Sequence, residues 1–417
     1  MTSACGLDFG TSNSTVGWSQ HGKASLLSLE QDKLTLPSVV FFNVEDDSVS
    51  FGRAALSDYL AGYEGRMMRS LKSLLGSNLI EGQTEVGGKI ITFRLLLAQF
   101  IQELKRRAEV SAGQEFAHVV MGRPVHFVDG NADADRLAER TLADIASAAG
   151  FRQVIFQYEP IAAAFDYEAT IQKEELVLIV DIGGGTSDFS LVRLSPGRKT
   201  KSDRRDDILA TGGVHIGGTD FDKYLSLSCV MPMFGLGTQL RNNTEVPSSY
   251  YFNLATWHTI NLAYTKKVLT QLNDVAQHAQ EPEKLARLLN LVEQRGGHWL
   301  ANKVEEAKIA LSAADSVELA LERIVPRQDL VLTRSQFDDS IEHLTVKISA
   351  TLTAMLVDAG VSADAIDTVF FTGGSSGVHL LREKIAAMVP SARRVEGDLF
   401  GSIGSGLAID AARLFGG

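Results

Sequence analysis

The hydrophobic pattern of this chain changes repeatedly between short apolar runs and helical stripes, as expected for an α/β protein. Residues 176–180 form an apolar run with β-branched members, which predicts a buried strand. Apolar residues at 93, 96, 97, 100, 101, 104 and 108 recur at helical spacing and predict an amphipathic helix over residues 93–110. Residues 368–372 predict another strand before a glycine turn, and residues 403–414 predict a last helix.

The most informative segment is a glycine-rich turn between two strand-like runs, with an aspartate on each side. Glycines allow positive φ and close approach to a ligand, and successive N–H groups in such a turn form an anion-binding nest. Carboxylates beside a phosphate make sense mainly when a divalent cation lies between them. We therefore interpret the segment as a metal and phosphate site, with a tight β-turn and incidental acids as the alternative. Its residues are Asp181, Gly183, Gly184, Gly185, Thr186 and Asp188.

The N-terminal segment repeats this design. A strand-like run reaches Asp8, a turn follows, and a second strand-like run begins. The turn consists of Gly10, Thr11, Ser12 and Asn13. A duplication with hydroxyl residues in register is harder to explain by chance than either copy alone. The two copies therefore predict two similar lobes, each presenting a phosphate-binding loop to a shared cleft.

Glu159 follows a predicted strand and precedes Pro160, which is expected at the first position of a helix. In α/β sheets, chemistry is concentrated at the carboxyl ends of strands, which favours a functional role for this acid. The alternative is that Glu159 only interacts favourably with the helix dipole. From this position alone the two interpretations are equally good.

Later positions carry weaker signals. Gly217 and Gly218 precede a predicted helix, which is a weak indication of phosphate binding. Residues 298–312 predict a helix with three polar residues on one face, a pattern that is ordinarily a solvated surface. Residues 195–207 are polar and predict a solvated hairpin tip, and residues 231–297 predict an inserted subdomain. The polar face contains Glu305, Lys308 and Ser312, and the glycine turn after residue 372 contains Gly373, Gly374 and Ser375.

Composition and charge exclude some classes of binding partner for this chain. The chain has 417 residues, of which 45% are hydrophobic and 22% charged, and a net charge of −11. Nucleic acid is excluded as the main partner because no clustered basic segment offsets this negative charge. The two cysteines, Cys5 and Cys229, do not make a disulfide framework. With no signal peptide and no apolar run of membrane-spanning length, we predict a cytoplasmic protein without a membrane partner.

Taken in order, seven motifs resemble the ATPase domain of DnaK-type heat-shock chaperones, and specifically the YegD-like subgroup. The resemblance covers essentially the whole chain and includes the segment from Val230 to Gly235 as a subgroup feature. Seven motifs in the same order are far more specific than any one of them. The motifs are Asp8-Phe-Gly-Thr-Ser, Lys72-Ser-Leu-Leu-Gly, Glu159-Pro-Ile-Ala-Ala-Ala, Asp181-Ile-Gly-Gly-Gly-Thr-Ser-Asp188, His215-Ile-Gly-Gly-Thr-Asp-Phe-Asp, Glu305-Glu-Ala-Lys308 with Ser312, and Thr372-Gly-Gly-Ser.

The resemblance implies an actin-like, ribonuclease-H-like ATPase fold. Two lobes, each with a mixed β-sheet flanked by helices, would enclose a nucleotide cleft. We expect lobe I to contain residues 1–173 and 400–417. Lobe II would then contain residues 174–399, with an inserted helical or mixed subdomain at about 231–310.

The resemblance also implies ATP or ADP with Mg²⁺ as ligands. Asp8 and Asp181 would hold the hydrated Mg²⁺ largely through water molecules, which suits an ion that keeps its waters. Lys72 would place its charge beside the γ-phosphate, and Glu159 and Asp188 would help to orient the ion and the attacking water. The implied catalytic residues are Lys72, Glu159, Asp181, Thr186 and Asp188. The implied nucleotide contacts are Gly10, Thr11, Ser12, Asn13, Gly183, Gly184, Gly185, Thr186, Gly217, Gly218, Glu305, Lys308, Ser312, Gly373, Gly374 and Ser375.

Three departures from the family pattern change the expectation. Ile309 and Gly377 stand where the relatives carry arginines that pack on either side of the adenine. Because each lost cation–π contact is worth about 0.5–2 kcal/mol, we expect weaker nucleotide binding and less adenine preference. Nanomolar ADP affinity in calorimetry would contradict that expectation. The chain also ends after the ATPase-like segment, so we expect no peptide-binding domain.

Together, these residues predict slow ATP hydrolysis that opens and closes the lobes, a change that a partner protein or co-chaperone reads. A non-hydrolysing nucleotide-responsive binding module is the alternative, favoured by the missing arginines. A small-molecule kinase on the same scaffold is a further alternative, although no separate acceptor base is evident.

Overall fold

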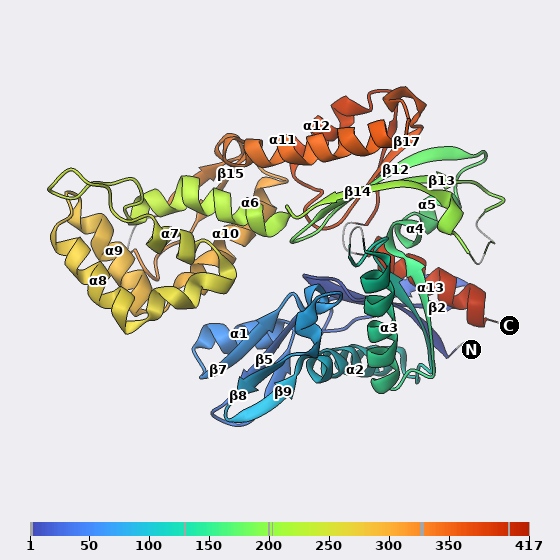
Figure 1. The fold of residues 1–417 in the computed structure, drawn as a ribbon, viewed down its shortest axis with the longest axis horizontal. Coiled ribbons are helices and arrows are strands. Elements are labelled where there is room, and N and C mark those ends of the chain that lie inside the picture. Colours follow the sequence, from blue (N-terminus) through green and yellow to red (C-terminus); the bar gives the residue numbers. More distant parts are fainter. Residues whose placement is uncertain are drawn as a thin grey trace. The chain divides into compact units, whose positions relative to one another are not determined.

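Two mixed β-sheets with the same arrangement of strands form the framework of the protein in this computed structural model (Figure 1). The structure describes residues 3–128, 131–198, 201, 203–325, 329–398 and 401–416. The first sheet has the order β11-β10-β1-β2-β3, with β4 also paired to β2, and the second has the order β14-β13-β12-β17-β18. The strands of the first sheet are β1 (Ala4–Asp8), β2 (Asn13–Gln20), β3 (Lys23–Leu26), β4 (Thr35–Pro37), β10 (His118–Arg123) and β11 (Gln153–Tyr158). Those of the second are β12 (Glu175–Ile182), β13 (Ser187–Leu194), β14 (Ile208–Val214), β17 (Thr368–Thr372) and β18 (Arg393–Glu396).

Each sheet is built around an antiparallel hairpin that is extended by parallel strands. In the first sheet β1 pairs antiparallel with β2 and parallel with β10, and β10 continues parallel to β11. In the second sheet β12 pairs antiparallel with β13 and parallel with β17, and β17 continues parallel to β18. The duplication predicted from the two glycine turns therefore extends to the order and direction of the surrounding strands.

The chain divides into two compact units. The first contains Met1–His215, Thr351–Ser376 and Ile385–Gly417, and it holds both large sheets. The second contains Ile216–Ala350 and Gly377–Lys384. The lobe boundaries expected from the sequence stay a prediction, and the one between residues 399 and 400 lies outside the described residues.

Smaller elements complete the first unit. A three-stranded sheet has the order β6-β5-β7, and β8 and β9 form a separate hairpin. The strands are β5 (Val39–Asn43), β6 (Val49–Phe51), β7 (Gly65–Arg69), β8 (Gln83–Val86) and β9 (Lys89–Thr92), and the helices are α1 (Arg53–Ala61), α2 (Phe93–Ala112), α3 (Ala132–Ala148), α4 (Glu159–Ala163), α5 (Phe165–Glu168) and α13 (Ser402–Phe415).

The second unit is largely helical. Its helices are α6 (Gly218–Leu225), α7 (Ser249–Leu254), α8 (Lys266–Gln277), α9 (Pro282–Glu293) and α10 (Gly297–Leu311), with the hairpin of β15 (Ser316–Leu319) and β16 (Leu330–Thr333). The aromatic residues of the predicted insertion contribute to a local core here, since Tyr251 is buried and donates a hydrogen bond to Phe234 O at 3.2 Å. Two helices contribute residues to both units, α11 (Arg334–Asp358) and α12 (His379–Met388).

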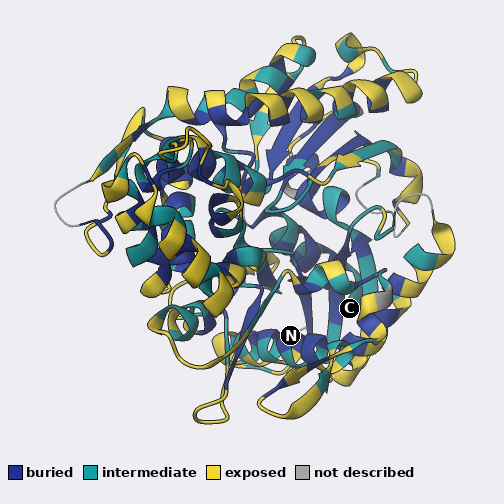
Figure 2. Ribbon diagram, turned by 60° about the vertical axis from the view of Figure 1, so that its left-hand side comes forward, coloured by how far each residue is buried: buried dark blue, intermediate teal, exposed yellow. Residues whose placement is uncertain are grey.

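Alternate residues of the first sheet pack on opposite faces, as strand geometry requires. Val119 and Met121 join a core with α2 and α3, while Val120 between them joins a core with α4 and α13. The helical stripe predicted over residues 93–110 is confirmed, because α2 buries its apolar positions from Leu96 to Ala108. Figure 2 shows the buried residues concentrated in the sheets and on the inner faces of the helices.

Helix α13 approaches the neighbouring backbone so closely that only glycine fits at the contact. A Cβ atom on Gly406 would lie 1.8 Å from Ala162 O, and one on Gly6 would lie 2.3 Å from Ala408 N. The glycine spacing of the last predicted helix is therefore explained by close packing against α4 and β1.

The prediction of a solvated tip over residues 195–207 was wrong for its C-terminal end. Arg204 is buried and donates to both carboxylate oxygens of Glu168 at 2.8 and 2.9 Å, and it also pairs with Asp207. Mutual neutralisation lets these charges leave water. The sequence could not reveal this, because Glu168 lies on α5, outside the polar segment.

Across the described residues, no helix combines the length and the apolar character needed to cross a membrane.

Candidate functional site

The two glycine-containing hairpins have the same register. Asp8 at the end of β1 lies opposite Thr15 on β2, and Asp181 near the end of β12 lies opposite Asp188 on β13. In the second turn, Gly183 N donates to Thr186 O at 3.0 Å. The two copies therefore differ at an equivalent position, where one carries a hydroxyl group and the other a carboxylate. Only the second hairpin offers two acids.

The turns of the two hairpins meet within the first compact unit. A Cβ atom on Gly184 would lie 2.0 Å from Ser12 Oγ, so a side chain larger than hydrogen would clash with the first turn. Gly373, with φ of +82°, lies against the second hairpin, and a Cβ there would be 2.3 Å from Asp181 Oδ1. The predicted loop residues of both hairpins and the turn after β17 therefore lie together.

A buried ion pair lies beside these turns. Lys72 Nζ and Glu159 Oε1 are 2.5 Å apart, and each side chain is only 12% exposed. Lys72 is carried by a short 3₁₀ turn, Leu71–Leu74, and Glu159 begins α4 directly after β11. Burial alone would lower the pKa of Lys72, but the charges of Glu159 and Asp8 outweigh it and raise the pKa above its usual value. Lys72 is therefore a firmly charged cation.

Asp8, which is buried, and Asp181, which is partly buried, have unusually high pKa values. The pKa of Asp8 is raised to about 7, mainly by burial and to a smaller extent by the negative charge of Glu159, although the positive charge of Lys72 opposes the shift. Burial, followed by the charges of Asp188, Glu159 and Asp8, raises the pKa of Asp181 to about 8. Asp8 and Asp181 therefore lie within electrostatic reach of each other. The region has more acidic groups than Lys72 can neutralise.

This crowding predicts a pH-dependent stability. Both pKa values lie above 3.8, so between about pH 4 and pH 8 the folded protein binds more protons than the unfolded chain. The contribution of these two groups to the free energy of unfolding therefore falls as the pH rises. Asp181→Asn removes one repelling charge, and we expect it to raise the free energy of unfolding by about 1–3 kcal/mol at about pH 8.5, with little change at about pH 5. Urea titration of the protein in EDTA at both pH values measures this.

An exposed acid provides the control for that experiment. Asp133→Asn should leave the free energy of unfolding within about 0.5 kcal/mol at either pH, because its side chain is 92% exposed. Destabilisation of Asp181→Asn at the higher pH would show that the carboxylate is favourably paired in the folded protein.

The donor atoms at this region fit Mg²⁺. Asp8 and Asp181 supply carboxylate oxygens, which are the ligands this ion prefers, and a cation between them would relieve the repulsion that raises their pKa values. In the part of the chain that the structure describes, no cluster of three or more His, Cys, Asp or Glu side chains could hold a metal directly. The predicted site uses two carboxylates and water, so that finding does not bear on it.

Thr186 contacts the acid that follows it. Its hydroxyl donates to Asp188 Oδ2 at 2.7 Å, which keeps both side chains on the same side of the second turn. In the glycine turn after β17, Ser375 is held by a backbone contact, since its N–H donates to Ile182 O at 2.9 Å. The predicted residues of the second sheet thus lie next to one another.

Five predicted nucleotide contacts belong to the second compact unit. Lys308 is buried and joins α10 to the start of α6, with Nζ 3.2 Å from Gly218 O and 2.8 Å from Asp222 Oδ1. Glu305 on the same helix and Ser312 directly after it are partly exposed. Gly217, the residue before α6, already donates its N–H to Asp220 Oδ2 at 3.0 Å, so this amide is engaged in capping the helix. The structure therefore brings Gly218 and Lys308 together and gives Lys308 a structural contact that the sequence did not predict.

Sequence reasoning missed Ser38. This buried residue follows β4 and makes hydrogen bonds to the first turn, to Gly10 and Ser12. The only local signal is Pro37, a residue that is found in sheets mainly on edge strands. Nothing in the spacing shows that the residue after this proline lies against a turn some 25 positions earlier, as the contacts show.

Comparison with known proteins agrees with this geometry. The family model described as Hsp70 protein matches residues 4–96, 77–235 and 275–416. The chain is 29% identical over 402 residues to a chaperone protein HscA homolog of Vibrio vulnificus (strain YJ016), covering 92% of the chain and 53% of that protein. It is 28% identical over 436 residues to an HscA homolog of Shewanella sp. (strain MR-7), covering 99% of the chain and 58% of that protein. The chain thus spans about half the length of the curated relatives it matches.

Proposed function

Because this chain belongs to the Hsp70 family, whose members are ATPases, we propose that it binds ATP with Mg²⁺ and hydrolyses it slowly. The observation that carries the proposal is the group formed by Asp8, Lys72, Glu159 and Asp181, in which one buried cation lies among buried acids. Phosphoryl transfer depends mainly on positioning and charge neutralisation, and this group can supply both. We place the nucleotide in a cleft between two actin-like lobes, one for each large sheet.

Each residue has a proposed role. Asp8 and Asp181 would hold the Mg²⁺ through water, and the ion would supply positive charge to the phosphates. Lys72 would place its ammonium group beside the γ-phosphate, and Glu159 would keep that ammonium in position through their 2.5 Å contact. Asp188, held by Thr186 at 2.7 Å, would accept a hydrogen bond from the attacking water. The turns at residues 10–13 and 183–186 would contact the phosphates through backbone amides other than that of Gly183, which already donates to Thr186 O.

The nucleoside end of the site is proposed from the family resemblance. Gly373, Gly374 and Ser375 would line one side of the nucleoside. On α10, Ile309 is 57% exposed, so its side chain is accessible to a ligand. An exposed isoleucine offers apolar contact without a cation, which is consistent with weak base recognition. The other proposed contacts are Gly217, Gly218, Glu305, Lys308 and Ser312.

The cellular role is proposed more broadly. The relatives from Vibrio and Shewanella are described as chaperone proteins, and we propose that a protein partner reads the nucleotide state of this chain. Membership of the YegD-like subgroup and a cytoplasmic location stay predictions from the sequence.

A phosphate-release assay tests the proposed reaction. The purified protein should release phosphate from ATP in the presence of Mg²⁺. Phosphate release should stop when EDTA removes the metal, because the charge of the phosphates is then not neutralised. Calorimetry on the same protein measures ATP binding separately. Binding without phosphate release would favour the non-hydrolysing module, and ATP consumption only on addition of a sugar would favour a kinase.

A further inference from the structure

Ser38 holds two carbonyl groups of the first hairpin turn. Its backbone N–H donates to Ser12 O at 2.9 Å, and its hydroxyl donates to Gly10 O at 2.7 Å. The residue is 1% exposed, so water does not compete for these bonds. The side chain and the backbone N–H of Ser38 thus bind the carbonyl groups of two alternate peptide units of the turn.

The proton of the Ser38 hydroxyl is committed to Gly10. The hydroxyl of Ser14 lies 3.0 Å from Ser38 Oγ, and since Ser38 has only one proton to give, Ser14 donates to it. Ser38 Oγ therefore accepts one hydrogen bond and donates another. The orientation of the Ser38 hydroxyl is therefore defined by Ser14 on β2 and by Gly10 in the turn.

Holding the carbonyls also determines where the next amides point. Because a trans peptide unit is planar, its N–H points away from its C=O. With Gly10 O and Ser12 O directed toward Ser38, the N–H groups of Thr11 and Asn13 are directed to the opposite side. These two N–H groups belong to alternate residues and lie on one side of the turn, where both can donate hydrogen bonds to the same anion.

We propose that Ser38 is a positioning residue that orients the amides of Thr11 and Asn13 toward the nucleotide phosphates. This inference rests on the proposed function. Donors that are already oriented before the ligand arrives bind it without the free-energy cost of reorganisation.

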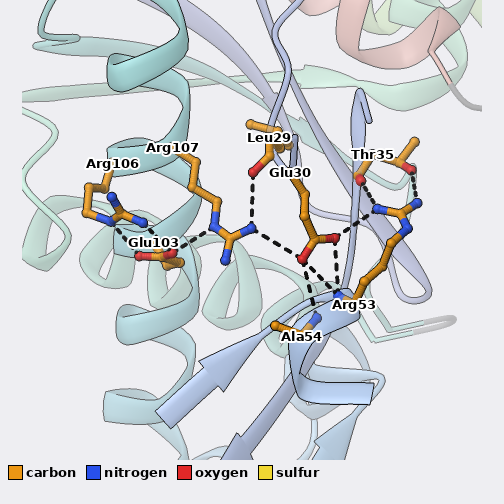
Figure 3. Close-up of polar contacts among 8 residues, drawn as sticks. All are labelled: Leu29, Glu30, Thr35, Arg53, Ala54, Glu103, Arg106 and Arg107. Atoms are coloured by element: carbon orange, nitrogen blue, oxygen red, sulfur yellow. Dashed lines mark hydrogen bonds and ion pairs between the residues drawn. The ribbon is translucent and has the colours of Figure 1, made fainter. Parts of the chain in front are cut away.

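The strand that leads to Ser38 is itself held firmly. Arg53 at the start of α1 donates to Thr35 O at 2.7 Å on β4 and pairs with Glu30 at 3.0 Å (Figure 3). Arg107 on α2 donates to Leu29 O at 3.1 Å and lies 3.5 Å from Glu30. Figure 3 shows Arg53 and Arg107 approaching Glu30 from opposite sides. This network ties the segment before Ser38 to two helices, so that Ser38 is a fixed support for the turn.

Two matched variants separate positioning from packing. Ser38→Ala removes the bond to Gly10 O and the bond to Ser14. Ser14→Ala removes only the bond between the two hydroxyls, and it also deletes one buried oxygen. Their thermal unfolding shows whether each variant is folded and whether they lose similar stability. Calorimetry then measures the affinity of each for ATP, ADP and adenosine in the presence of Mg²⁺.

The effect should depend on the phosphates. We expect Ser38→Ala to bind ATP and ADP about tenfold more weakly while adenosine affinity stays within about twofold. Ser14→Ala should bind all three ligands within about threefold of the unmodified protein. Equal losses for ATP and adenosine, or unchanged ATP binding by a folded Ser38→Ala, would overturn the inference.

A measurement without nucleotide gives an independent readout. Hydrogen–deuterium exchange of a peptide covering residues 9–16 should be faster in Ser38→Ala than in Ser14→Ala, because only the former releases Gly10 O. Equal exchange rates in the two variants would contradict the proposal that Ser38 holds the turn through Gly10 O. Failure of the unmodified protein to bind ATP would contradict the proposed function as well, whereas normal ATP binding by Ser38→Ala contradicts the inference alone.

Discussion

Lys72→Ala is expected to lower kcat for ATP hydrolysis by about a hundredfold or more while ATP affinity changes by no more than about threefold. The side chain places a firmly charged ammonium group beside Glu159 and among buried acids, where its charge would balance that developing on the γ-phosphate. Binding is expected to survive, because the turns and the Mg²⁺ provide most of the phosphate contacts in the proposed site. Single-turnover phosphate release and calorimetry measure the two quantities separately.

Lys105→Ala is the matched control for this experiment. Lys105 and Glu109 form an ion pair at the same distance, 2.5 Å, and their side chains are also largely buried. This pair lies on α2, away from the hairpin turns, so its loss should affect stability but leave kcat within about twofold. Equal turnover of Lys72→Ala and the unmodified protein would contradict the role given to Lys72. Loss of ATP binding in Lys72→Ala would show that this lysine acts in the ground state.

Arg204→Ala is expected to lower the free energy of unfolding by about 3–5 kcal/mol. Arg204 has a fully buried side chain that binds both oxygens of Glu168 and also Asp207. Removing it leaves the buried carboxylate of Glu168 without this cation, while Asp207 keeps its pair with Arg198. Urea unfolding at neutral pH measures the change. ATP hydrolysis should be retained wherever the variant is folded, because this cluster lies apart from the hairpin turns.

An exposed arginine shows what a surface ion pair contributes. Arg136 pairs with Asp133 while remaining 60% exposed, so Arg136→Ala should change the free energy of unfolding by less than about 0.5 kcal/mol. A loss below about 1 kcal/mol for Arg204→Ala would mean that water reaches Glu168 and Asp207 once the arginine is gone.

Local pattern was sufficient for the elements that surround the candidate site. The stripe of α2, the proline-started helix at Glu159 and both aspartate-containing hairpins were predicted, because hydrophobic periodicity and turn residues act within a few positions. The repeated hairpin also allowed the two similar sheets to be anticipated. Where the pattern was purely polar, as over residues 195–207, the same reasoning led to the wrong environment for Arg204.

Thus the sequence by itself determined which residues could supply carboxylates, a lysine and glycine turns, since these are properties of residue type and short-range spacing. Only the tertiary structure decided which of them meet. It joined Lys72 to Glu159 across 87 positions, placed Ser38 against the first turn and buried Arg204 with Glu168. Such pairings depend on how distant strands and helices pack, and a buried polar group is stable only where packing provides its partner.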